Sequence, residues 1–191
     1  MINLKFFSAL FLLTVVCSSC ALLPQQVHLT PMIIMPQANI GQGRPVEVMV
    51  IDERKVKTLG HRSIMNGVGV ITLVEDPAVK FKRDIERLFE ARGFTVASGA
   101  MASDIKVGVR IKSIGYRMDA RVVAIVVSTE ANIGVEVMKQ STQVYRQDYH
   151  AANETTMILA PTASENENFI NETIAQIFMQ MVKDDKLFSI L

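Results

Sequence analysis

The chain has 191 residues, with 20 Lys and Arg against 19 Asp and Glu, which gives a formal net charge of +1. This balance excludes the strongly basic surface that attracts nucleic acids or anionic lipids, so we expect no nucleic-acid partner. The length is sufficient for one domain with its own hydrophobic core. Only two cysteines occur, Cys17 and Cys20, which excludes a fold held together by several disulfides.

Residues 1–19 have the pattern of a secretory signal peptide. Lys5 supplies a positive charge near the start, and residues 6–16 form an apolar run that is too short to cross a bilayer. Ser18 and Ser19 follow as the small residues that precede a cleavage site. The leader therefore predicts export of the remaining chain.

The stretch Ser18-Ser19-Cys20 resembles the lipobox of bacterial lipoproteins, although Cys17 stands where Leu is usual. The resemblance implies cleavage before Cys20 and acyl chains on its sulfur and amine, which leaves no free thiol in the mature chain. Two or more chains bind a membrane stably. Ala21 in place of Asp implies transit to the outer membrane, with the domain facing the periplasm. The alternative is an ordinary cleaved signal and a free secreted product.

Residues 20–45 are predicted to be the lipidated Cys20 and a Pro- and Gln-rich tether, because closely spaced prolines disfavour helix and favour extended chain. Two apolar runs, residues 27–29 and 32–35, do not suit a solvated tether. Either one of them lies on the domain as an edge strand, or they stay exposed and dock a partner.

Residues 46–191 are predicted to form a single α+β domain. Valines at alternate positions indicate a strand over residues 46–52, and residues 68–74 are a second strand candidate. Asp76 and Pro77 suit the N-cap and first position of a helix, which Gly93 closes as a left-handed residue.

In the second half of the domain, apolar and polar residues alternate over 105–112 and 127–137, and strands are expected over 105–112, 122–138 and 142–152, which predicts an antiparallel meander with one long strand. The first turn is expected near residues 115–120. Ser164 and Glu167 fit a capping box, and apolar residues at helical spacing continue to about Lys183. The predicted fold is thus α+β, with a mainly antiparallel sheet and two helices packed on one face.

Residues 122–127 are apolar on both faces of the expected strand. The run is either a central strand that is covered on both sides or a partner surface near the hairpin tip, with Val123 and Ile125 as its contact residues.

No catalytic, cofactor or metal motif is apparent in the sequence, and we expect no enzyme activity. The three histidines are far apart and lack metal-ligand spacing. The best charged cluster lies at Asp52 and Arg62, which could meet if their strands pair. It is either a structural ion pair or a ligand-binding cluster.

The order of these features resembles the YajG family of bacterial lipoproteins. The resemblance rests on Val46–Arg54 with its Val-x-Val-x-Val-Ile-Asp-x-Arg pattern, on Leu59-Gly60-x-Arg62, and on the helix end Ala91-Arg92-Gly93-Phe94 before the meander. It implies an outer-membrane lipoprotein with no catalytic residues.

Two functional hypotheses follow from the sequence. The leading one is a non-enzymatic, outer-membrane-anchored lipoprotein that serves as an accessory or structural subunit and binds another cell-envelope component, most simply an envelope protein. The alternative is a periplasmic small-ligand or peptidoglycan-binding module that uses the region of Asp52 and Arg62. The oligomeric state stays open.

Overall fold

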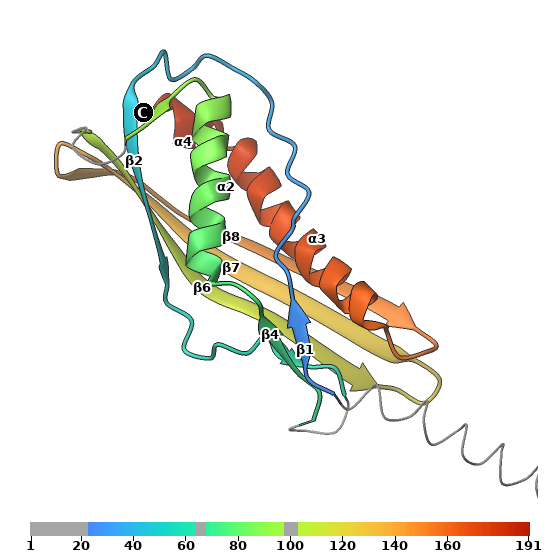
Figure 1. Ribbon diagram of the computed structural model, residues 1–191. Coiled ribbons are helices and arrows are strands. Elements are labelled where there is room, and N and C mark those ends of the chain that lie inside the picture. Colours follow the sequence, from blue (N-terminus) through green and yellow to red (C-terminus); the bar gives the residue numbers. More distant parts are fainter. Residues whose placement is uncertain (1–22, 64–67, 98–102) are drawn as a thin grey trace, which may run out of the picture.

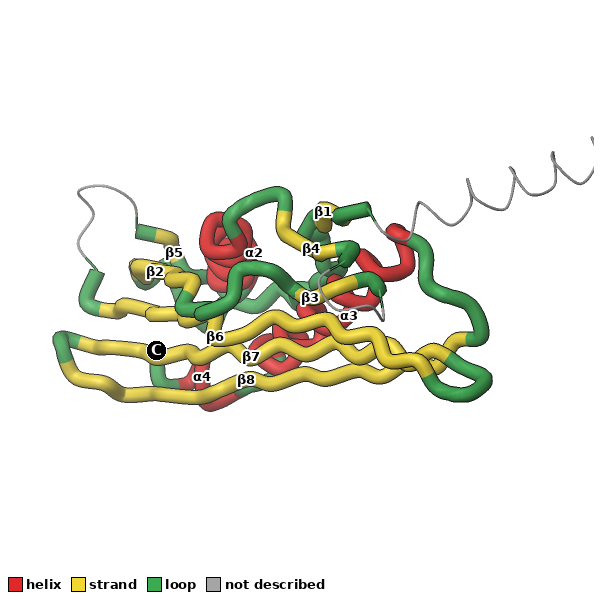
Figure 2. Tube along the Cα trace, turned by 90° about the horizontal axis from the view of Figure 1, so that it is seen from below, coloured by secondary structure: helices red, strands yellow, loops and turns green. Residues whose placement is uncertain are grey.

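The computed structural model describes residues 23–63, 68–97 and 103–191. In this part of the chain, one mixed sheet of eight strands carries its helices on a single face, as Figure 1 and Figure 2 show from two directions. The predicted signal peptide and Cys20 lie outside the described residues.

Three long strands form the centre of the sheet: β6 (Ile105–Ala120), β7 (Ile125–Lys139) and β8 (Thr142–Met157). They pair antiparallel, as the alternating pattern predicts. The register between β6 and β7 shifts between Ile111 and Ser113, which marks a bulge. The first turn lies at residues 121–124, later than the predicted 115–120, because the polar and apolar alternation continues through Tyr116 and Met118.

The sheet as a whole is mixed, so the prediction of a mainly antiparallel sheet needs correction for the strands that pair in parallel. The strand β2 (Pro45–Asp52) pairs parallel with β6 on one side and with β5 (Thr95–Val96) on the other. The chain returns from β2 to β5 and β6 through a helix, and such a crossover brings strands together in parallel. Alternation of side chains indicates a strand but does not indicate its direction.

The strand β2 covers only the first half of one edge of β6. Along the second half of that edge, three short strands extend the sheet outward. They are β3 (Gly60–His61), which pairs parallel with β6, β4 (Val70–Leu73), which pairs antiparallel with β3, and β1 (Gln25–Val27), which pairs parallel with β4. One edge of β6 therefore pairs with β2 and β3 in turn, while β7 occupies its other edge.

The helix α2 (Pro77–Ala91) begins and ends as predicted. The side chain of Asp76 accepts a hydrogen bond from the Ala78 amide at 2.8 Å. Gly93 follows the last turn with a φ of 84°, a conformation that glycine adopts without steric cost.

The helix α3 (Ala163–Val182) is capped by Thr162 and Glu165, and not by the predicted Ser164 and Glu167. A third helix, α4 (Asp185–Ser189), follows it, so the prediction of two helices omits one. Five residues are too few to give a recognisable helical period in the sequence.

The hydrophobic core fills the space between the helices and the sheet. Phe81 of α2 meets Phe178 of α3 at 5.4 Å between ring centroids, and Phe89 meets Phe188 of α4 at 5.8 Å. Alternate residues of the long strands supply the other side of the core, among them Val107, Val109, Ile133 and Val135. Removing these side chains from water stabilises the fold by roughly 1.5–3 kcal/mol each.

Candidate functional site

Residues 25–35, within the predicted tether, are part of the folded domain. Val27 and Leu29 are buried in the core, and Leu29 is only 1% exposed. Ile33 and Met35 also pack against the core, whereas Met32 and Ile34 face solvent. The structure thus places on the domain a segment that the sequence assigns to a tether, and its edge strand is β1 at residues 25–27.

Hydrogen bonds hold this segment along the start of α3. The side chain of Gln25 donates to the Ala163 carbonyl at 2.7 Å and accepts from Asn166 at 3.0 Å. The hydroxyl of Tyr116 donates to Asn166 at 2.6 Å, so β1, β6 and α3 meet in one buried polar network. Burial raises the pKa of Tyr116 above its ordinary value of 10.0, so this hydroxyl stays protonated and able to donate even in alkaline solution.

The chain between Cys20 and the domain is therefore short. Cys20 precedes Gln25 by five residues, which span at most about 18 Å when fully extended. If acyl chains hold Cys20 in a bilayer, the start of β1 stays within that distance of the membrane surface.

The hairpin between β6 and β7 is exposed at its tip. Val122 is fully exposed and Val123 is 83% exposed, while the Arg121 amide closes the turn by donating to the Ala124 carbonyl at 2.7 Å. Ile125 differs, because it is half-buried and packs against the core. Of the two predicted contact residues, only Val123 points freely into solvent.

Asp52 forms an ion pair with a residue close to it in the chain. Arg54 donates to it with two nitrogens, at 2.9 and 3.0 Å, and Lys57 lies 2.9 Å away. Burial alone would raise the pKa of Asp52, but hydrogen bonds from Arg54 and Lys57 outweigh it and lower the pKa to about 2. This arrangement supports the structural interpretation of the cluster.

Arg62 lies apart from Asp52. Asp52 ends β2, and Arg62 follows β3. These two strands do not pair with each other but with different parts of β6: Asp52 lies opposite Ile111, and Gly60 lies opposite Tyr116. The Arg62 amide donates to the Gly69 carbonyl at 2.8 Å. Within the described residues, no hydrogen bond or ion pair joins Arg62 to Asp52.

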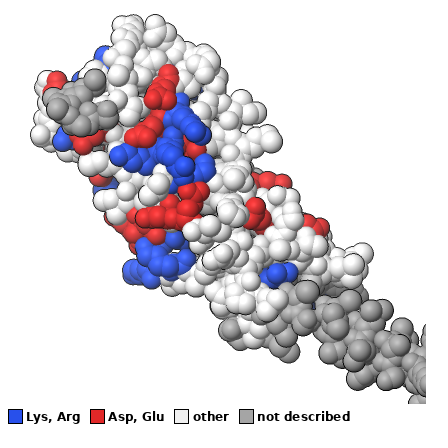
Figure 3. Space-filling model, viewed as in Figure 1, with Lys and Arg blue, Asp and Glu red and all other residues white. Residues whose placement is uncertain are grey.

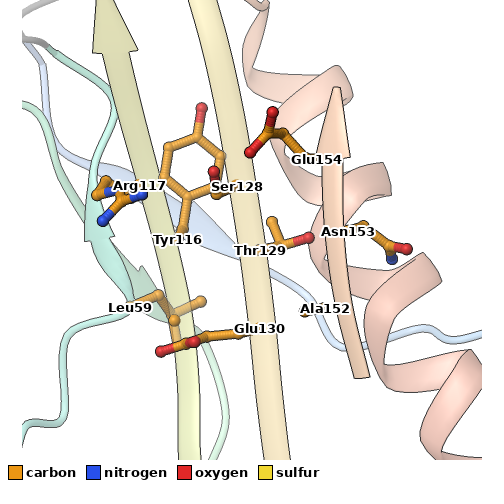
Figure 4. A pocket seen from close by; sticks show the side chains of 10 residues that line it. Leu59, Tyr116, Arg117, Ser128, Thr129, Glu130, Ala152, Asn153 and Glu154 are labelled. Carbon is orange, nitrogen blue, oxygen red and sulfur yellow. The ribbon is translucent and has the colours of Figure 1, made fainter. Parts of the chain in front are cut away.

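A hollow of about 540 Å³ lies on the central strands, and Figure 4 shows its lining. Thr129 and Tyr116 bond to α3, so alternation directs Arg117, Ser128 and Glu154 to the helix-free face. Gly115 and Ala152 flank Glu130 across the strands, and their small side chains leave the space open. The exposed carboxylates of Glu130 and Glu154 offer hydrogen-bond acceptors to a hydroxyl-rich ligand, whereas the hydroxyl of Ser128 is buried and has no hydrogen-bond partner among the described residues.

The hollow lacks the geometry of nucleophilic catalysis. Glu154 lies opposite Ser128 across the sheet, and His150 is four residues away along β8. His150 therefore lies about 13 Å along the strand from the position opposite Ser128, well beyond the reach of a hydrogen bond to the Ser128 hydroxyl. Among the described residues, no group of three His, Cys, Asp or Glu side chains is placed to hold a metal ion.

A polar cluster that the sequence analysis misses joins β8 to α4. The hydroxyls of Tyr145 and Tyr149 donate to one carboxylate oxygen of Asp184, at 2.5 and 2.9 Å. Burial, followed by the bond to Asp184, raises the pKa of Tyr145 to about 12. Burial opposes ionisation of Asp184, but hydrogen bonds from the two tyrosines and from the Leu187 and Lys186 amides together outweigh it and lower its pKa. The tyrosine spacing is visible in the sequence, whereas their acceptor, 35 residues beyond Tyr149, carries no local signal.

Comparisons with solved structures support the fold. A crystal structure of a protein from Xanthomonas campestris is 10% identical, with a TM-score of 0.61 over 86% of this chain and 95% of that chain. Uncharacterized lipoprotein B from Nitrosomonas europaea is 9% identical, with a TM-score of 0.46 over 84% of this chain and 93% of that one. A minor lipoprotein from Acinetobacter baumannii is 9% identical, with a TM-score of 0.45 over 80% and 94%. Only the first likeness is strong enough to show a shared fold.

Comparisons of sequence identify the family. No curated protein gives a significant match to the chain. Among the described residues, none of the helices is long and apolar enough to cross a membrane. A family model described as "uncharacterized lipoprotein" matches residues 31–191, and the chain therefore belongs to this lipoprotein family.

Proposed function

We propose that the protein is a non-enzymatic lipoprotein of the outer membrane, anchored through acyl chains on Cys20, and that its domain binds another cell-envelope component in the periplasm. The family match over residues 31–191 supports the lipoprotein assignment. Ser18, Ser19 and Ala21 around Cys20 support acylation and the outer-membrane destination. The order of motifs from Val46 to Phe94 supports a place among YajG-like proteins.

One observation carries the proposal: the domain begins almost directly after the acylation motif. Gln25 is hydrogen-bonded to α3 only five residues after Cys20. The anchor would hold the domain against the membrane and would not allow it to move widely through the periplasm. Such placement suits a subunit of an assembly at the membrane surface.

The outer edge of β8 is the best surface for a protein partner. This strand of 16 residues pairs only with β7, so along its other edge the described part of the chain provides no strand partner. An unpaired edge of this length can accept an extended segment of another protein through backbone hydrogen bonds. We therefore infer that the partner contributes a strand.

A glycan is the second candidate, and the hollow at Ser128 is the observation that favours it. The exposed carboxylates of Glu130 and Glu154, which line it, can accept hydrogen bonds from the hydroxyl groups of a sugar. The Asp52 region is less suitable, since Arg54 and Lys57 already neutralise the carboxylate. Retention on purified peptidoglycan that Ala152→Arg abolishes, by filling the hollow, would favour this function.

The test is co-purification from detergent-solubilised envelopes, with Cys20 intact and with Cys20→Ser in parallel, followed by mass spectrometry. We expect the wild-type protein in the outer-membrane fraction together with a discrete set of partners that the Cys20→Ser variant loses. Absence of partners from both preparations would contradict the proposed subunit role. A wild-type protein that stays in the soluble fraction would contradict the anchor.

A further inference from the structure

We propose that four exposed apolar side chains insert into the lipid surface beside the anchor, and we call them the apolar tip: Val122, Val123, Ile158 and Leu159. The inference rests on the proposed anchor at Cys20. The partner of the surface predicted near the β6–β7 hairpin tip would then be the lipid bilayer.

The apolar tip consists of two loops at one end of the sheet. Val122 and Val123 occupy the turn between β6 and β7, and Ile158 and Leu159 follow the end of β8, with exposures of 86% and 77%. The loops are neighbours because Ile125, just after the first, pairs with Met157, just before the second. Large apolar side chains exposed side by side usually mark a contact surface.

The anchored end of the chain lies at the same end of the molecule. Gln25 contacts Ala163, which is only four residues after Leu159 and thus within about 14 Å of it along the chain. Figure 1 shows that β1 begins at the same lower end of the molecule as the β6–β7 turn and the loop after β8, while Figure 2 shows that the width of the sheet separates β1 from that turn. A bilayer that holds Cys20 would therefore lie close to the apolar tip.

The distribution of charge favours the same orientation. On the face that Figure 3 displays, charged side chains gather over α2, and near the apolar tip the exposed side chains of Arg117 and Asp119 neutralise each other in a pair at 2.8 Å. Arg121 is exposed directly beside Val122. Its aliphatic stem can lie along the apolar surface while its guanidinium contacts lipid phosphates.

The size of the apolar tip favours lipid over a protein. Stable protein interfaces bury at least about 1,000 Å² with close complementarity, and four side chains on two loops offer much less. Insertion into a bilayer requires no matching surface, and an anchor that holds the start of β1 within about 18 Å of the membrane keeps the local concentration of lipid high. Contact at the tip would fix the orientation of the domain and leave the edge of β8 accessible to a partner.

The experiment uses tryptophan as a reporter, since the chain contains none. The acylated Val123→Trp and Leu159→Trp proteins are reconstituted into vesicles of zwitterionic and anionic phospholipids with brominated acyl chains. The control is Thr142→Trp, an exposed position after the β7–β8 turn at the opposite end. Flotation and the mass of the amino-terminal peptide establish first that each protein is acylated and bound.

We expect the emission at positions 123 and 159 to shift to shorter wavelength and to be quenched by the brominated chains, while the emission at position 142 stays unchanged. Floating, acylated protein in which positions 123 and 159 behave like position 142 would overturn the inference and leave the anchor intact. Loss of flotation would overturn both. A wavelength shift without bromine quenching, dependent on the protein-to-lipid ratio, would indicate a second copy of the chain and also overturn the inference.

Discussion

The ion pair between Asp52 and Arg54 makes a specific prediction about stability and pH. Asn at position 52 keeps the shape of the side chain but removes its charge, and Arg54, whose side chain is only 4% exposed, loses its counterion. The pKa of Asp52 falls from its ordinary 3.8 to about 2 in the folded protein. At ~1.4 kcal/mol per unit, this difference corresponds to about 2 kcal/mol of stability.

The sign of the pH dependence follows from the lowered pKa. The stabilisation by Asp52 is complete above its unfolded pKa of 3.8 and is lost as the pH falls towards about 2. Asp52→Asn should therefore destabilise the domain by about 2 kcal/mol at pH ~7, and the difference from wild type should shrink steadily below pH ~4.

Urea unfolding followed by circular dichroism measures this difference, with both proteins carrying Cys20→Ser to avoid acylation. With a urea m-value of ~2 kcal/mol/M, the midpoint at neutral pH should fall by about 1 M. Asp119→Asn is the matched control, because its pair with Arg117 is exposed and should be worth less than about 1 kcal/mol. A midpoint difference that is absent at neutral pH, or equal at neutral and acidic pH, would refute the structural role of Asp52.

Three further substitutions test the packing of the chain, each by the free energy of unfolding in urea. Leu29→Ala should cost about 2–4 kcal/mol because it leaves a cavity in the core, whereas Met32→Ala, at an exposed site, should cost almost nothing; equal effects would contradict docking of this segment. Asn166→Ala should cost about 2 kcal/mol or more by leaving the buried groups of Tyr116 and Gln25 unpaired, and an unchanged midpoint would argue against the buried network. Thr162→Ala should cost about 1 kcal/mol through loss of the N-cap, and a larger effect of Ser164→Ala would place the cap at the predicted position instead.

Local signals in the sequence predict local structure well. Asp76, Pro77 and Gly93 define the ends of α2, because capping and left-handed backbone depend on residues within one turn. The alternation over residues 105–112 and 127–137 predicts the start of β6 and most of β7, because side-chain alternation is also a local signal, whereas the end of β6 at Ala120 lies beyond the predicted strand. At the start of α3, two Ser/Thr and Glu pairs at the same spacing compete, and the sequence alone does not decide between them.

Contacts between distant segments could not be predicted in the same way. The prolines before residue 45 indicate an extended chain, but an extended chain can be solvated or can pack on a domain. The elements that residues 25–27 contact, β4 and α3, are remote in sequence, so no local signal indicates the packing. The sequence suggests a pair between Asp52 and Arg62 if their strands pair, but the chain after β2 brings Arg54 back onto Asp52. Within the candidate site, the apolar run predicts the exposure of Val123 as one alternative, whereas no local signal predicts that Ile158 and Leu159 lie beside it.

The most direct test of the account is the state of the amino terminus of the mature protein. Mass spectrometry of the amino-terminal peptide, prepared from separated envelope membranes, determines which residue comes first and what it carries. The account predicts that the chain begins at Cys20, bears acyl chains on its sulfur and amine, and is recovered with the outer membrane. A mature chain that begins at another residue, or an unmodified Cys20 in the soluble fraction, would contradict it.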